Sequence, residues 1–152
     1  MVNISLDLIR KLREESGAPV MRVKAVLEEY KGDEKKALDL LKKEGFEKAE
    51  KRGERETKVG AIFAYVHHNQ KVAGISEIFS ETDFVAKNEL FQTLGKNLAM
   101  QVASMGEKNF DKQEFIKDPS KKIEDLVKEV IAKTGENIRI GRTLQIELGK
   151  KK

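Results

Sequence analysis

The stretch that decides the fold is GAIFAYVHHNQKVAGISEIF, residues 60–79. Two runs rich in Ile, Val, Phe and Tyr, at 60–66 and 72–79, flank the polar tetrapeptide at 68–71. β-Branched and aromatic residues on both sides of a short polar turn are typical of two antiparallel strands. The stretch therefore predicts a β-hairpin.

The residues after this hairpin change to a helical pattern. Apolar residues recur at helical spacing from Phe84 to Met105, just before a glycine. A second helical pattern starts at Ser120 and is closed by Gly135, and the polar segment 107–118 between the two is expected to be mostly irregular. Spacing of this kind predicts two amphipathic helices that each bury one side.

A third strand is predicted near the C-terminal end of the sequence. From Ile138 to Leu148, apolar residues alternate with polar ones, which is the pattern of a strand with one buried face. Arg142 is the residue that interrupts the apolar face, and the sequence assigns it no role. Together with the hairpin, this strand gives a three-stranded antiparallel sheet packed with helices, so the predicted fold class is α+β.

The N-terminal third of the chain is predicted to be helical and to end in a charged segment. Amphipathic repeats predict three short helices over residues 4–45, the third of which stops at Gly45. From 47 to 56, eight of the ten residues are charged, which fits a solvated linker or an exposed helix. We therefore divide the chain into a helical module at 1–46, a charged linker at 47–56 and an α+β unit at 57–152.

Composition narrows the possible classes of function. The chain has 152 residues, 39% of them hydrophobic and 37% charged, and no cysteine, which excludes disulfides, thiolate zinc sites and thiol nucleophiles. No run approaches the length of a membrane helix or resembles a secretory signal, so we expect a cytoplasmic protein that does not bind membranes. The 30 basic residues are interleaved with 26 acidic ones, which argues against direct nucleic-acid binding. These features favour a protein that meets another protein.

The sequence offers no catalytic or cofactor site. The two histidines, His67 and His68, are adjacent, and neighbours in a strand point to opposite faces, so a shared metal ion is not expected. We find no phosphate-binding glycine loop, no plausible catalytic triad and no carboxylate pair poised for acid–base chemistry. We therefore expect a protein without enzymatic activity, metal or cofactor, whose informative parts are surfaces.

One candidate surface lies where the second predicted helix begins. Met21 falls off the apolar stripe of that helix, and the basic residues Arg13 and Lys24 flank it. An exposed Met beside basic side chains suits a docking surface, because Met adapts to varied apolar partners. The sequence leaves it equally open that Met21 merely covers the small helical core.

The second candidate surface is the segment ETDFVAKN at 81–88. Thr82 is a good N-cap residue, and Asp83 suits the positive end of a helix. Phe84 precedes Phe91 by seven residues, so periodicity places both on one helical face and favours a core position for Phe84. The first turn of a helix after a loop is, however, the part most able to project beyond its own core, which keeps Phe84 a candidate contact residue.

The residues singled out so far resemble a known family. The segment at 81–88, with the phenylalanine that follows three residues later, is similar to the signature of elongation factor Ts, the guanine-nucleotide exchange factor of bacterial-type translation elongation. The residues at 65–68, with Gly74, resemble the hairpin of that family, and stretches at 12–18 and 135–138 match as well. The resemblance runs in order over essentially the whole chain.

The resemblance implies a domain organisation. It makes the helical module a three-helix domain of the ubiquitin-associated type, and residues 57–152 a single core exchange domain. Longer members of the family carry a second core lobe, which dimerisation can replace, so we expect a homodimer through the sheet or its edge; an uncovered sheet also favours this. Pro19 and Arg22 depart from the Gly and Asp of the family pattern, which affects the detailed contacts of the module.

The resemblance also implies a function. Such a protein binds elongation factor Tu in its GDP-bound and nucleotide-free forms, and it promotes GDP release by disturbing the Mg²⁺ and phosphate site. Asp83 and Phe84 would intrude beside the switch region of the partner, with Thr82 and Val85 in the same contact segment. The contact positions carried over to the helical module are Arg13, Val20, Met21 and Lys24. The alternatives are a ubiquitin-associated-type adaptor that binds another protein and, from the basic balance of the chain, an RNA-binding protein.

Overall fold

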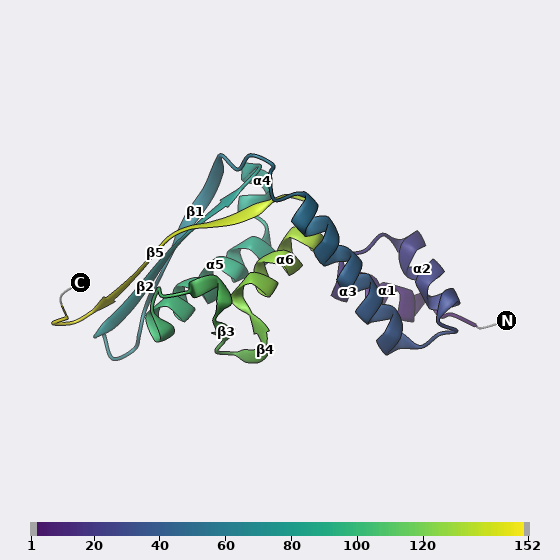
Figure 1. Cartoon of the computed structure of the whole chain (residues 1–152), viewed down its shortest axis with the longest axis horizontal. Coiled ribbons are helices and arrows are strands. Elements are labelled where there is room, and N and C mark those ends of the chain that lie inside the picture. Colours follow the sequence, from purple (N-terminus) through teal and green to yellow (C-terminus); the bar gives the residue numbers. More distant parts are fainter. Residues whose placement is uncertain (1–2, 151–152) are drawn as a thin grey trace.

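The computed structural model describes residues 3–150. Figure 1 shows an elongated molecule in which N-terminal helices form one end and a twisted sheet with its covering helices forms the other. The buried apolar residues fall into two clusters, one in each part. The class is α+β, as predicted, because the helices of the first part precede a separate antiparallel sheet.

The helical part consists of α1 (Leu6–Ser16), α2 (Val20–Glu29) and α3 (Glu34–Lys51). Local chemistry sets the helix ends: the Ser5 hydroxyl accepts a hydrogen bond from the Leu8 N–H at 3.1 Å, and Asp33 caps α3 in the same way. The cluster that holds the three helices together is fully buried at its centre, in Leu12, Val23, Val26, Leu27 and Ala37.

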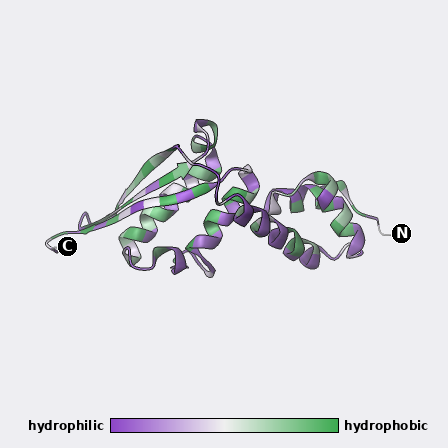
Figure 2. Ribbon diagram, turned by 45° about the horizontal axis from the view of Figure 1, so that its top comes forward, coloured by the Kyte–Doolittle hydropathy of each residue, from purple (hydrophilic) through white to green (hydrophobic). Residues whose placement is uncertain are grey.

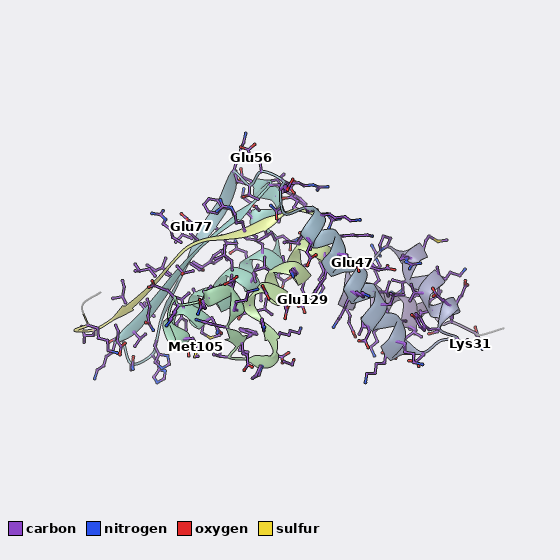
Figure 3. All side chains as sticks on the ribbon, viewed as in Figure 1. Lys31, Glu47, Glu56, Glu77, Met105 and Glu129 are labelled. Carbon is purple, nitrogen blue, oxygen red and sulfur yellow. The ribbon has the colours of Figure 1, made fainter. Side chains whose placement is uncertain are left out.

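The third helix is longer than predicted. It continues through Gly45 to Lys51, so the expected stop at Gly45 is wrong, and the first half of the charged segment is helical. The reason is tertiary packing: a Cβ atom at Gly45 would lie 3.2 Å from the Cβ of Ala132, so the glycine allows α3 to approach α6 (Ile123–Thr134) closely. Contact with a second helix outweighs the weak helix propensity of one glycine. Figure 3 shows Glu47 on this extension.

The predicted sheet is confirmed. Strands β1 (Val59–Val66), β2 (Val72–Ser80) and β5 (Ile138–Glu147) form an antiparallel sheet in the order β1-β2-β5. Ser76 pairs with Phe63 on one side, and Ile78 pairs with Ile140 on the other. Figure 2 shows hydrophobic and hydrophilic residues alternating along these strands, as expected of a sheet with one buried face.

Helix α5 (Glu89–Met105) covers the buried face of the sheet at very short range. A Cβ atom at Gly74 would lie 2.1 Å from the carbonyl oxygen of Ala99, and one at Gly95 would lie 2.1 Å from the ring of Phe63. Only a residue without a side chain fits at either position. The buried Phe91 ring packs against Phe63, with the ring centroids 6.0 Å apart.

Two local predictions in this part are wrong. The single helix expected from residue 84 is broken into α4 (Asp83–Ala86) and α5, because Asn88 caps a new helix with its side chain. Ser120 does not start a helix either: it lies in β4 (Asp118–Lys122), which pairs with β3 (Glu114–Phe115), and α6 starts only at Ile123. The polar segment before it also contains a short 3₁₀ helix, η1 (Phe110–Lys112).

Within residues 3–150, no helix is long and apolar enough to cross a membrane, and no group of three or more His, Cys, Asp or Glu could hold a metal ion. The prediction that His67 and His68 face opposite ways is wrong, because both lie beyond the end of β1, and their ring centroids are 4.1 Å apart. The Tyr65 hydroxyl lies 2.9 Å from Nδ1 of His67 and orients the first of the two rings.

Candidate partner-binding surfaces

The first surface is the short helix α4, which begins directly after β2. Thr82 is its N-cap, and the Thr82 hydroxyl accepts a hydrogen bond from the Val85 N–H at 3.3 Å. The Ser80 hydroxyl donates to the Thr82 carbonyl oxygen at 2.9 Å, which ties the cap to the end of the strand. Asp83 occupies the first turn, where its negative charge complements the helix dipole.

A second set of contacts anchors the same segment to the loop between α6 and β5. The backbone N–H and the hydroxyl of Thr82 donate to the two carboxylate oxygens of Glu136, at 3.0 and 2.7 Å. The Asn137 N–H in turn donates to a carboxylate oxygen of Glu81 at 2.7 Å, and Arg55 lies 3.7 Å from that oxygen. Residues more than fifty positions apart therefore hold α4 in place.

Phe84 is the most exposed large apolar side chain in this part of the molecule, with 82% of its surface accessible. Its neighbours Val85 and Ala86 are buried, and Phe91 is fully buried. The break at Asn88 rotates α4 relative to α5, so the two phenylalanines no longer share a face. The core position that periodicity favours for Phe84 is therefore wrong, and Val85 holds the helix to the core instead.

The second surface lies on α1 and α2. Met21 is 74% exposed, so it does not cover the helical core, and Val20 beside it is also exposed. Arg13 and Lys24 are exposed on the same two helices. Arg22, which departs from the family pattern, forms a bidentate ion pair with Glu44 of α3.

The Arg22–Glu44 ion pair shifts the pKa of both groups. Hydrogen bonding to Glu44 raises the pKa of Arg22, and hydrogen bonding to Arg22 lowers the pKa of Glu44. The arginine therefore adds a contact between α2 and α3 in place of the aspartate of the family pattern.

The structure does not bring the two surfaces together. Figure 1 places α4 at the top of the sheet lobe, near the C-terminal end of α3, whereas α1 and α2 lie at the other end of α3. A partner that touched both surfaces would have to extend along α3.

A third exposed surface is the face of the sheet that α5 does not cover, here called the open sheet face. It carries the apolar side chains of Ile62, Ala64, Val66, Ala73, Ile75, Leu144 and Ile146. Ile62 and Val66 are more than 60% exposed, and Ile146 is 52% exposed. Figure 3 shows Glu77 on the same side of the sheet, away from α5.

The structure also explains Arg142, to which the sequence assigned no role. A register shift between Ser76 and Ile78 places Arg142 beside Glu77. The Glu77 carboxylate accepts hydrogen bonds from the Arg142 backbone N–H at 3.0 Å and from Arg142 Nη2 at 2.9 Å. These hydrogen bonds lower the pKa of Glu77. The arginine thus fixes the irregular part of the β2–β5 pairing.

Comparison with known proteins places this sequence in one family. The family model described as elongation factor TS matches residues 81–152, from the α4 segment to the end of the chain. Elongation factor Ts of Thermotoga neapolitana is 39% identical over 97% of this chain and 98% of its own length. The chain belongs to the elongation factor Ts family. Two further relatives agree with this assignment. Elongation factor Ts of Thermotoga maritima is 38% identical over 97% of this chain and 98% of its own length, and that of Thermosipho melanesiensis is 35% identical over 96% of this chain and 99% of its own length.

Membership of the elongation factor Ts family assigns the chain a role in translation elongation. The alignments run over 194 positions although this chain has 152 residues, so each relative has residues at positions where this chain has none.

Sequence reasoning missed the contact between Glu136 and Thr82. The sequence gives no signal for it, since the two residues are 54 positions apart and on different elements.

Proposed function

We propose that the protein is a guanine-nucleotide exchange factor for elongation factor Tu that acts in the cytoplasm. The observation that carries the proposal is the exposed ring of Phe84 on a short helix held in place from two sides. Burying a ring with 82% of its surface accessible requires a second molecule. An aromatic side chain on a rigid base is the kind of residue that dominates the binding energy of protein interfaces.

Exchange follows from coupling between two binding sites. If the protein weakens the binding of GDP to elongation factor Tu by some factor, GDP weakens the binding of the protein by the same factor. The protein therefore binds the GDP-bound form, accelerates the release of GDP and holds the nucleotide-free form until another nucleotide arrives. It does not choose between GDP and GTP, so their concentrations set the direction.

In this proposal, the ring of Phe84 inserts between helices of the partner, and Asp83 contacts the partner beside it. Mg²⁺ demands nearly ideal octahedral geometry, so a small shift of the loops that hold it releases the ion and weakens the grip on the phosphates. Val85 contributes from within its own core, because its buried side chain fixes the direction of the neighbouring ring. Thr82 contributes as the cap of the same helix.

The surface around Met21 is proposed to contact a second region of elongation factor Tu. It combines exposed apolar area, in Val20 and Met21, with the positive charges of Arg13 and Lys24. Because this surface is separate from α4, it adds affinity and orientation and leaves the phosphate site to Phe84. Met21→Lys should weaken the complex and leave the maximal exchange rate at saturation unchanged.

The test is the release of labelled GDP from elongation factor Tu, measured over a series of protein concentrations. The proposal requires acceleration that saturates with concentration. It also requires that excess Mg²⁺ slows the accelerated reaction. Unchanged release at all concentrations would refute it. Co-precipitation with ubiquitin in place of elongation factor Tu would instead support an adaptor of the ubiquitin-associated type.

We also propose that the protein forms a homodimer through the open sheet face. A contiguous exposed apolar surface is uncommon in monomers and marks a contact with another protein. The face is self-complementary in a symmetric pair, since it is apolar around Ile62 and Ile146 and carries the paired charges of Glu77 and Arg142 at one side. Dimerisation would cover the sheet that has no second lobe against it.

Sedimentation analysis tests the dimer directly. Ile62→Lys should convert it to a monomer, because a charge at the centre of an apolar interface would be buried without a partner. Leu6→Lys is the matched control, since Leu6 is equally apolar and 78% exposed but lies on α1. A monomeric wild-type protein at micromolar concentration, or equal effects of the two changes, would contradict the proposed dimer.

A further inference from the structure

A cavity of about 250 Å³ lies at the junction of the helical module and the sheet lobe. Its walls are the turn from Ser16 to Pro19, the side of α3 and the C-terminal end of α6. The residues of this junction belong neither to the Phe84 surface nor to the Met21 surface. The cavity therefore requires a separate explanation.

The cavity carries an excess of positive charge. Lys48, Arg52 and Lys133 line it, and the one acidic residue in its wall is Glu44. The carboxylate of Glu44 is already occupied by the bidentate pair with Arg22. Three cationic residues thus line a space whose acidic side chain is hydrogen-bonded to Arg22.

Arg52 supplies the decisive observation. Its Nη1 atom is buried and has no hydrogen-bond partner within residues 3–150. Buried polar atoms without partners are rare in folded proteins, and an unpaired donor on a charged guanidinium is especially unfavourable. The planar guanidinium has N–H donors in a fixed geometry that matches the oxygens of a carboxylate or a phosphate.

The two helix ends beside the cavity have opposite effects on the binding of an anion. Helix α2 begins next to the cavity wall, and Pro19 offers it no side-chain cap, so its positive end favours an anion. The C-terminal end of α6 opposes this, but the carbonyl of Gly135 accepts a hydrogen bond from Arg55 at 3.4 Å and that of Val130 accepts one from Thr134 at 2.8 Å. The three side-chain cations decide the balance.

We propose that this cavity is a binding site for a phosphate-sized oxyanion, with Arg52 as its principal donor and Lys48 and Lys133 as supporting cations. The bound anion would connect α3 to the end of α6 and so stiffen the junction between the helical module and the sheet lobe. The site is independent of the proposed exchange activity. The anion can be free phosphate or the phosphate group of a nucleotide.

The experiment uses the full chain without elongation factor Tu. Binding of inorganic phosphate is measured by titration calorimetry and by the melting temperature, against chloride at equal ionic strength, and GDP is titrated in a parallel arm. Phosphate should raise the melting temperature more than chloride does. Binding of GDP with at least the affinity of inorganic phosphate would identify the nucleotide as the source of the anion, and weaker binding would identify free phosphate.

Variants connect the effect to the cavity. Arg52→Gln should weaken phosphate binding about tenfold or more, since it removes a charge-assisted bidentate donor. Arg10→Gln is the control, because Arg10 is highly exposed on α1 and pairs only loosely with Asp7 at 3.9 Å. If Arg52→Gln does not fold, Lys133→Gln takes its place. Equal stabilisation by phosphate and chloride, or unchanged binding after the cavity substitution, would overturn the proposal, as would a crystal structure from phosphate with only water beside Arg52.

Discussion

Replacing Phe84 by Ala separates the stability of the fold from the function proposed for it. The Phe84 side chain is 82% exposed, so less than a fifth of its surface is buried in the folded protein. Phe91, seven positions later and fully buried, provides the same substitution in the opposite environment. The two variants therefore form a matched pair.

The magnitudes follow from burial. A phenylalanine that buries about 200 Å² when enclosed contributes only about 40 Å² at position 84, which is worth about 1 kcal/mol of stability. The better helix propensity of Ala offsets about half of that. Phe91→Ala removes a fully enclosed ring and should cost about 3–5 kcal/mol. In a protein of this size, these values correspond to a fall in melting temperature of at most about 3 °C for Phe84→Ala and about 10 °C or more for Phe91→Ala.

The function should respond in the reverse order. If Phe84 is an interface hot spot, its truncation costs about 2 kcal/mol or more, which is a loss of about thirtyfold in exchange efficiency. Labelled-GDP release, normalised to the folded fraction from circular dichroism, measures this for both variants. Phe91→Ala should keep near-normal exchange per folded molecule. A large fall in the melting temperature of Phe84→Ala with normal exchange per folded molecule would refute the reasoning, because the ring would then serve its own core.

Three further changes test the parts of the fold that support the surfaces. Gly74→Ala should strongly destabilise the protein in urea unfolding, since the added Cβ would lie 2.1 Å from a backbone oxygen of α5; an unchanged midpoint would show that the helix can move away. Glu77→Gln should flatten the acid limb of stability against pH. The folded pKa of Glu77 is lowered by Arg142, so its contribution is present above the unfolded pKa and is lost as the pH falls through the folded one; parallel curves for variant and wild type would contradict this. Thr82→Val should speed hydrogen exchange at the Ala86 N–H, which donates to the Thr82 carbonyl, because α4 loses its cap and the hydrogen bond from the Thr82 hydroxyl to Glu136. Unchanged exchange would mean that the backbone bond to Glu136 and the buried Val85 suffice to hold the helix.

The sheet could be predicted from the sequence because its determinants are local. Alternation in β1 and β2, and again from Ile138, fixes which face is buried, and a polar turn fixes the pairing of the hairpin. The α+β class follows directly from these three strands and the helical repeats around them.

The elements that were predicted wrongly depend on contacts that the sequence does not display. The continuation of α3 past Gly45 depends on Ala132, which lies on a helix almost ninety residues later. Ser120 is predicted to start a helix, but it lies in β4, which pairs with β3, and the Asp118 carboxylate accepts a hydrogen bond from its hydroxyl at 2.6 Å. In both cases a tertiary or side-chain contact outweighs a local propensity.

The exposed position of Phe84 is intermediate between the sheet, which could be predicted, and the elements that were predicted wrongly. The residues that determine it are close in sequence, but two of them must be considered together. Thr82 and Asn88 are both strong N-cap residues, six positions apart, and each caps a helix in the structure. A second cap so soon after the first leaves room for a single turn and no more, since the chain must leave helical geometry at the cap residue. Heptad spacing therefore does not carry across Asn88. The same short turn leaves two consecutive residues, Val85 and Ala86, to bury the helix, and it directs Phe84 outward. The exposure of Phe84, on which the proposed exchange mechanism depends, is thus a consequence of cap spacing. Asn88→Ala should reduce this exposure by allowing α4 and α5 to join into one helix. Slower amide exchange at residues 87–90 would detect the joined helix, and unchanged exchange there would contradict the reasoning.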